Sequence, residues 1–221
     1  MNVNSNAYTY TFATVMVVLV AVLLSGASLG LKSRQASNIS QEKRQSILAS
    51  IGIDVERSES DAAFTEYIKK SLTIQGGKVV SEDANAAFDI DMAAAIKADN
   101  MDRTVPLYVA EKDSETFYIV PMRGKGLWGP VWGFVALESD GNTVVGATFD
   151  HKSETPGLGA EISTPIFQDQ FPGLEIMEGK QFVSIEVRKG DASGTHQVDG
   201  ISGGTITSVG VDAMLKDCLQ G

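Results

Sequence analysis

The chain has 221 residues, and its composition and charge already limit what it can be. It carries 28 acidic and 18 basic residues, which gives a formal net charge of −10, and all of these charged residues lie after residue 31. Such an acidic chain is a poor candidate for nucleic-acid binding, which depends on basic residues placed against phosphates. The length allows one membrane anchor and one substantial domain.

Residues 12–31 form an uncharged run rich in Val, Leu and Ala. At 1.5 Å per helical residue this run is about 30 Å long, enough to cross the hydrocarbon core of a bilayer. A cleaved signal peptide is the alternative, because Ser25-Gly26-Ala27 is similar to a cleavage site. However, no Lys or Arg precedes the run, and it outlasts a typical signal-peptide core. We therefore expect an N-terminal segment at residues 1–36, with a retained transmembrane helix at about residues 12–31, and one domain at residues 37–221.

The charges near this run leave its orientation open. Lys32, Arg34, Lys43 and Arg44 follow the run, and no basic residue precedes it. The positive-inside rule alone would keep the domain in the cytoplasm. Long domains, however, translocate largely regardless of charge.

Helical patterns dominate the first part of the domain. Residues 37–52 have apolar residues on one side and Gly52 as a stop. A second helix is predicted from Ser60 through Leu72, because apolar residues recur there at helical spacing and Gly76-Gly77 would end it. Residues 83–98 are ambiguous between a strand and a helix.

Strand patterns follow, and they predict an α+β domain with a largely antiparallel sheet. Residues 105–110 and 115–122 flank a turn at 112–114, and residues 131–138 and 143–149 flank a turn at 140–142, so each pair predicts a hairpin. Lys180–Arg188 alternates as a further strand. A short helix is expected within residues 162–171, limited by Pro165.

The most informative segment is Asp199-Gly200-Ile201-Ser202-Gly203-Gly204-Thr205-Ile206-Thr207, a glycine-rich turn that opens the last predicted helix. On that helix the apolar residues Val209, Met214, Leu215 and Cys218 fall near one face. A helix start presents N–H groups without partners and partial positive charge, which suit an anion such as phosphate. The ordinary alternative is a plain helix start with Ser202 as the N-cap, and spacing alone favours it.

Three motifs in this chain resemble those of the NqrC/RnfG family of FMN-carrying subunits of membrane electron-transport complexes. Asp-x-x-Ser-Gly-x-Thr at 199–205 resembles the flavinylation motif, although Gly204 stands where alanine is usual. Glu154-Thr155-Pro156-Gly157-Leu158-Gly159 and Gly126-Leu127-Trp128 resemble the other two. Thr195-His196-Gln197-Val198 before the first motif is more similar to NqrC than to RnfG.

The resemblance implies a cofactor and residues to hold it. In the family a separate flavin transferase esterifies the final threonine of the motif, here Thr205, to the phosphate of FMN. The implied recognition residues for that transferase are Asp199, Ser202, Gly203 and Thr205. The implied cofactor-binding residues are Leu127, Trp128, Glu154, Thr155, Gly157, Leu158, Ser202, Gly203 and Gly204.

The resemblance also implies a place and a role. The chain would be a single-pass protein of the cell inner membrane with its FMN domain in the periplasm. With other membrane subunits it would relay electrons through FMN toward quinone in a sodium-pumping NADH:quinone oxidoreductase. No Gly-x-Gly-x-x-Gly occurs, so NADH binding on this chain is not expected. The alternatives are the equivalent Rnf-type electron-transport protein and a membrane-tethered assembly or binding protein without flavin.

Other residues that often carry chemistry have ordinary interpretations. Trp128 and Trp132 fit core aromatics beside a hairpin as well as a flavin wall, and for Trp132 we favour the core. Glu154 also fits a loop acid paired with a base. His151 and His196 lack a pattern for metal, so no metal site is expected. Cys218 is the only cysteine, which excludes an internal disulfide, and it fits a small buried apolar residue.

Overall fold

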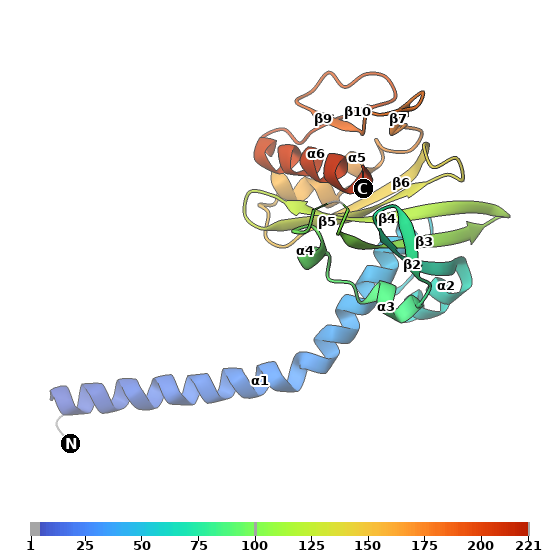
Figure 1. Ribbon diagram of the computed structural model, residues 1–221. Helices are drawn as coiled ribbons and strands as arrows, with labels where there is room; N and C mark the ends of the chain where they lie inside the picture. Colours follow the sequence, from blue (N-terminus) through green and yellow to red (C-terminus); the bar gives the residue numbers. More distant parts are fainter. Residues whose placement is uncertain (1–4, 100, 221) are drawn as a thin grey trace. The chain divides into compact units, whose positions relative to one another are not determined.

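The computed structural model describes residues 5–99 and 101–220 (Figure 1). These residues fall into two compact units, with the boundary between Glu42 and Lys43. A long helix, α1, makes up most of the first unit, and its last residues belong to the second. Among the described residues, α1 is the one helix that is long and apolar enough to cross a membrane. The helices are α1 (Asn6–Ala49), α2 (Ser60–Tyr67), α3 (Ala84–Phe88), α4 (Met92–Ala95), α5 (Pro165–Gln168) and α6 (Thr205–Leu219), with 3₁₀ turns η1 (Arg57–Glu59) and η2 (Gly159–Ser163).

Six of the described strands form one antiparallel sheet in the order β2-β1-β3-β4-β5-β6, as the α+β prediction requires. Both predicted hairpins are confirmed, β3 with β4 and β5 with β6. The first one turns at Asp113 and Ser114, which adopt φ of 53° and 68°. The strands are β1 (Ile68–Gln75), β2 (Lys78–Ser81), β3 (Thr104–Lys112), β4 (Glu115–Lys125), β5 (Pro130–Leu137), β6 (Val144–His151), β7 (Met177–Glu178), β8 (Gln181–Phe182), β9 (Glu186–Arg188) and β10 (Gln197–Asp199).

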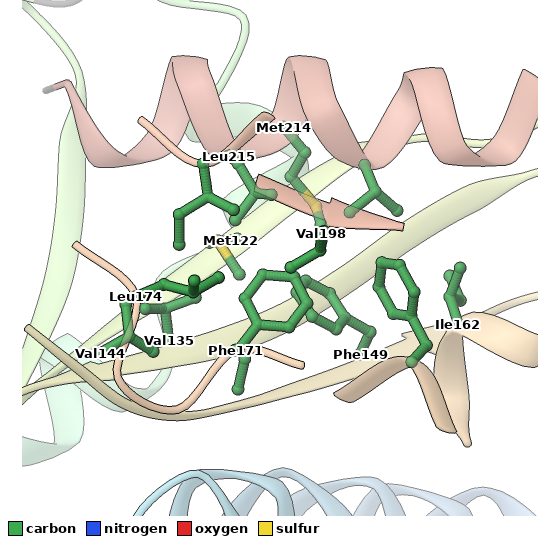
Figure 2. Close-up of a cluster of buried hydrophobic side chains, with 14 of the residues drawn as sticks. Met122, Val135, Val144, Phe149, Ile162, Phe171, Leu174, Val198, Met214 and Leu215 are labelled. Carbon is green, nitrogen blue, oxygen red and sulfur yellow. The ribbon is translucent and has the colours of Figure 1, made fainter. Parts of the chain in front are cut away.

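One face of the sheet packs against α6, and this face carries the larger core cluster (Figure 2). Alternate residues of β5, Val131, Val135 and Leu137, point to this face, as the two-residue period of a strand requires. Met214 and Leu215 of α6 reach down toward a group of aromatic rings from the segments below. The ring centroids of Phe149, Phe167 and Phe171 lie 5.0–5.5 Å apart.

The other face packs against the end of α1, α2 and α3. Ile47 and Ile51 join Tyr108, Phe117, Ile119, Phe134 and Ala136 in a second buried cluster. Ser50, at the end of α1, lies so close to β6 that a Cβ added to Gly146 would be 2.5 Å from the Ser50 carbonyl oxygen. The helix ends at Ala49, and Gly52, with φ of 69°, donates its amide to the Ala49 carbonyl, in agreement with the predicted stop.

Two predicted elements are wrong in part. The helix from Ser60 ends at Tyr67, and residues through Gln75 form β1, because β2 and β3 pair with this segment from both sides. Gly76 and Gly77, both with positive φ, therefore turn a hairpin instead of ending a helix. Lys180–Arg188 is two short strands broken at Ser184, whose φ is 64°. The ambiguous residues 83–98 contain the two short helices α3 and α4, and the short helix near Pro165 is α5 with η2 before it.

Candidate functional site

The start of α6 differs from the ordinary helix start. Its N-cap residue is Gly204, and no side chain caps the first amides, so Ser202 is not the N-cap and lies exposed. The first N–H groups of an α-helix lack partners within the helix and carry partial positive charge. Thr205, the first residue of α6, is exposed. An exposed hydroxyl therefore stands directly at an uncapped helix start.

Glu154 connects two of the sequence motifs with α6. Its side chain is only 4% exposed. Oε1 accepts a hydrogen bond from the Trp128 amide at 2.8 Å, and Oε2 accepts one from the Thr207 hydroxyl at 2.6 Å. Burial opposes ionisation, but the Thr207 hydroxyl and the backbone amides of residues 127–129 outweigh it and hold the pKa of Glu154 below its usual value. The carboxylate is thus a charged centre shared by the 126–128 loop, the 154–159 loop and α6.

Glycines allow these three segments to approach so closely. A Cβ on Gly126 would lie 2.6 Å from Oε1 of Glu154, and a Cβ on Gly159 would lie 2.6 Å from Oε2. A Cβ on Gly210 of α6 would overlap the carbonyl oxygen of Lys125. At these three positions a side chain has no room, so glycine there is a steric requirement of the packing.

Apolar side chains remain exposed on these same segments. Trp128 is 66% exposed, which rules out the core interpretation for this residue, and Leu127 and Leu158 are also exposed. Leu158 reaches the last turn before α6, where a Cβ on Gly203 would lie 2.7 Å from its Cδ2. On α6 itself Ile206 and Val209 are exposed. We call Leu127, Trp128, Leu158, Ile206 and Val209 the apolar rim.

Val209 contradicts the predicted apolar face of the last helix. The buried residues of α6 are Thr207, Ser208, Val211, Met214 and Leu215. Met214 and Leu215 are confirmed as core residues, and Cys218 packs at the edge of the same cluster, where burial raises the pKa of its thiol. Val209 faces solvent on the side of the helix that starts with Thr205, since residues four apart share a face. Trp132 is only half-buried and lies outside both core clusters, so the core prediction for it is also wrong.

The 154–159 loop is held by its own backbone. The Thr155 carbonyl accepts hydrogen bonds from the amides of Leu158 and Ala160, at 3.1 and 3.2 Å, while the Thr155 side chain is exposed. Gly157 has φ of 75° and donates its amide to Oε1 of Glu161 at 2.8 Å. Thr155, Gly157 and Leu158 thus present an ordered, solvent-facing edge next to the buried Glu154.

Asp199 is exposed but well anchored. The side-chain oxygen of Gln170 accepts a hydrogen bond from the Asp199 amide at 2.8 Å, and its Nε2 donates one to the Asp199 carbonyl at 3.2 Å. The carboxylate of Asp199 accepts the Ala192 amide at 2.9 Å. The first residue of the flavinylation-like motif is therefore fixed from two sides before the chain reaches Thr205.

The remaining candidates have structural partners. Nδ1 of His151 accepts a hydrogen bond from the Glu154 amide at 3.2 Å, and Nδ1 of His196 lies 2.6 Å from the Glu175 carbonyl oxygen. Within residues 5–99 and 101–220 no group of three or more His, Cys, Asp or Glu side chains could hold a metal ion. The ion pairs of these same residues do not include Glu154, so its interpretation as a loop acid paired with a base is wrong.

Sequence reasoning missed Thr207 and underrated the glycines. Thr207 follows the flavinylation-like motif by two residues, but its partner Glu154 is 53 residues away, so local spacing carried no signal of the contact. Gly126 and Gly159 belong to the other two motifs, and nothing in their local sequence explains why glycine is needed. Their reason is the space that Glu154 occupies.

Comparison with known proteins identifies relatives of the chain. The family described as FMN-binding domain matches residues 126–220, which contain all three motifs. The C subunit of the Na(+)-translocating NADH-quinone reductase of Vibrio alginolyticus is 33% identical over 88% of this chain and 82% of its own length. The same subunit of Pseudomonas aeruginosa is 33% identical over 97% of this chain and 91% of its own length.

Solved structures agree with the sequence relatives. The crystal structure of the corresponding reductase subunit from Parabacteroides distasonis is 43% identical, with a TM-score of 0.78 over 86% of this chain and 93% of that one. The structure of Shewanella oneidensis NqrC is 27% identical, with a TM-score of 0.66 over 82% of this chain and 90% of that one. The chain belongs to the NqrC family, the C subunits of the Na(+)-translocating NADH-quinone reductases.

Proposed function

We propose that this chain is the FMN-carrying subunit of a sodium-pumping NADH:quinone oxidoreductase, with FMN bound through a phosphoester to Thr205. The observation that carries the proposal is an exposed threonine hydroxyl at the uncapped start of α6, beside the exposed apolar rim. The match to an FMN-binding domain and the relatives named as the C subunit of the reductase support it. FMN, when bound, supplies reversible one- and two-electron transfer.

The residues present fit the two unlike halves of this cofactor. The phosphate ester is anionic, and the free amides and dipole of α6 stabilise an anion at its start. The isoalloxazine is a flat apolar ring, and Leu127, Trp128 and Leu158 offer exposed apolar surface for it. The exposed Thr155 side chain offers a polar group at the ring edge, and Gly157 leaves space beside it because it has no side chain. Gly203 and Gly204 leave the approach to Thr205 free of side chains.

Attachment needs an enzyme, and the exposed motif suits one. In the proposed step the Thr205 oxygen loses its proton and forms the bond to phosphorus, while the bond from phosphorus to the leaving group of an activated flavin phosphate breaks on a flavin transferase. Asp199, Ser202, Gly203 and Thr205 are proposed as the recognition residues. Ser202, Gly203 and Thr205 are exposed, and Asp199 is exposed and anchored by Gln170. These positions support access by a second protein without unfolding of the domain.

A series of variants tests the attachment. Full-length chain is coexpressed with a flavin transferase, and in-gel fluorescence after denaturation detects covalent flavin. Thr205→Val keeps the side-chain shape and should lose all of this signal. Thr207→Ser should keep it, and Ser202→Ala should lower it without abolishing it, because the attachment atom remains. Trp128→Ala should keep it while shifting the flavin absorption spectrum. Peptide mass spectrometry that places FMN on Thr207 or Ser202 would contradict the proposal, and a wild type without flavin would favour an assembly protein.

The proposed place of the protein is the inner membrane, with α1 as a single-pass anchor and the domain in the periplasm. There it would receive electrons within the complex and pass them through FMN toward quinone, while NADH is oxidised on another subunit. The apolar residues 12–31 of α1 are exposed in the described chain, which supports lipid contact for this segment. A reporter fused to the C-terminus should be active only in its periplasmic form. Activity of the cytoplasmic form would show that the basic residues after the anchor set the orientation.

A further inference from the structure

Thr207 lies two residues beyond Thr205 and points into the domain instead of toward solvent. It is 1% exposed, and its hydroxyl donates to Oε2 of Glu154. The chemistry proposed for Thr205 does not use this hydroxyl. A buried hydrogen bond between a threonine and a carboxylate, placed beside a cofactor loop, therefore needs a separate explanation.

Glu154 keeps its charge through hydrogen bonds. Among the described residues, the ion pairs join Arg44 with Asp61, Arg103 with Asp217, and Lys216 with Asp212, and none includes Glu154. Its carboxylate is held by the Thr207 hydroxyl and by the amides of the 127–129 loop. A buried charge that loses one such donor becomes costly, so it takes up a proton or turns out to water.

We propose that Thr207 is a positioning residue that holds Glu154 and, through Glu154, keeps the 126–129 loop in register with the start of α6. Oε2 is bound to α6 and Oε1 to the loop, so the one carboxylate links the two segments. This inference rests on the proposed function, since Leu127 and Trp128 are assigned to the ring of FMN and Thr205 to its phosphate. The link then sets the place of the ring wall relative to the phosphate anchor.

The surroundings leave this link little freedom. Cβ atoms at Gly126 and Gly159 would both lie 2.6 Å from Glu154 oxygens, so backbone closes on the carboxylate from two sides. The β-branched threonine restricts χ1, which fixes the direction of the hydroxyl better than serine does. Loss of the Thr207 hydroxyl should therefore change the position of the 126–129 loop, because the carboxylate has little space in which to adjust.

The test compares two variants that differ in one group. Thr207→Val keeps the shape and loses the hydroxyl, whereas Thr207→Ser keeps the hydroxyl. In full-length chain made without flavin transferase, NMR-detected exchange of the Trp128 amide should be about tenfold faster or more in Thr207→Val, because its anionic acceptor is lost. In Thr207→Ser the exchange should stay within about threefold of wild type.

A control separates this role from plain loss of stability. Val211→Ala removes a buried side chain one turn further along α6 and should lower stability while leaving the Trp128 amide protected relative to its neighbours. If Thr207→Val fails to fold, Glu154→Gln replaces it, because the amide keeps the size and removes the charge. It should also speed exchange at Trp128.

The flavin-loaded chain gives a second readout. Thr207→Val should retain covalent FMN but shift its midpoint potential and absorption spectrum, and Thr207→Ser should stay closer to wild type than Thr207→Val does. Equal Trp128 exchange in wild type and folded Thr207→Val would overturn the inference, and, where Thr207→Val does not fold, equal exchange in wild type and Glu154→Gln would do so. A wild type without covalent flavin would overturn the proposed function instead, and the exchange measurement, which needs no flavin, would still decide the role of Thr207.

Discussion

The two faces of the sheet are packed by different means. On the face that carries the candidate site, α6 approaches backbone to backbone, with Gly210 against the Lys125 carbonyl. A single buried carboxylate, Glu154, joins the segments there. On the other face the end of α1 packs chiefly through side chains such as Ile47 and Ile51, with one close glycine contact at Gly146.

Charged side chains are also held differently on the two faces. Near the end of α1, Nζ of Lys43 lies 4.2 Å from the centroid of the Phe88 ring, and the Arg44 guanidinium lies 4.6 Å from the same centroid. Such contacts attract through the ring quadrupole and tolerate small shifts. The carboxylate on the site face is held by directed hydrogen bonds at fixed distances. The site face therefore depends on the exact position of one carboxylate, whereas the α1 face depends mainly on apolar contact and cation–ring attraction.

The largest expected effect comes from filling the space beside Glu154. Gly159→Ala would place a Cβ 2.6 Å from Oε2 and against the Thr207 hydroxyl. The backbone of Gly159 is not in the left-handed region, so overlap alone is tested. We expect a loss of about 3 kcal/mol, seen as a fall of roughly 10 °C in Tm for the full chain in detergent.

Gly129→Ala is the matched control for this substitution. Its Cβ would meet Oγ of Ser153 at 2.9 Å, and Ser153 is an exposed side chain that can turn away. This variant should lose less than about 1 kcal/mol. Equal losses in the two variants would mean that Glu154 is not tightly enclosed.

A smaller effect is expected from the charge of Glu154. Hydrogen bonds hold its folded-state pKa below the unfolded value, so its contribution to stability is present above the unfolded pKa and is lost as pH falls through the folded pKa. Glu154→Gln should cost about 2 kcal/mol at pH 7, since it removes a charge-assisted pair of bonds. The cost should shrink as the pH falls below about 4, which thermal denaturation across pH would follow. A cost that is the same at pH 3 and pH 7 would contradict the charged state.

The sequence predicted what depends on neighbours along the chain. The β3–β4 and β5–β6 hairpins were found because their turn residues, such as Asp113 and Gly141, carry local information. The three motifs were also found, and the structure brings two of them together with α6 at Glu154, while Gly203 of the third lies beside Leu158. Attachment of FMN at Thr205 stays a prediction.

What was missed depends on partners far away in the sequence. Residues 68–72 have helical spacing, yet pairing with β3 makes them a strand. Ser202 has the right residue type for an N-cap, but Gly204 takes that place. Val209 fits an apolar face by spacing and lies exposed beside the Thr205 end of α6. A bound cofactor that covers Val209 would explain why this apolar side chain is exposed.

The last expected effect lies on the α1 face, at Lys43. Burial lowers the pKa of Lys43 to about 8, against the opposing attraction of Asp89, although its Nζ donates to the Phe88 carbonyl. The unfolded chain binds the extra proton up to about pH 10.4, so between these values stability should rise with pH. Lys43→Met keeps the apolar stem and removes the titration. The free energy of unfolding of wild type minus that of Lys43→Met should therefore increase from pH 8 to pH 10 in denaturant titrations. Lys70 is an exposed lysine of β1, so Lys70→Met is the control for the removal of any one charge. A difference that falls over this range would show that the ring and carbonyl contacts hold the ammonium more strongly than burial opposes it, and the α1 face would then depend on directed charge as the site face does.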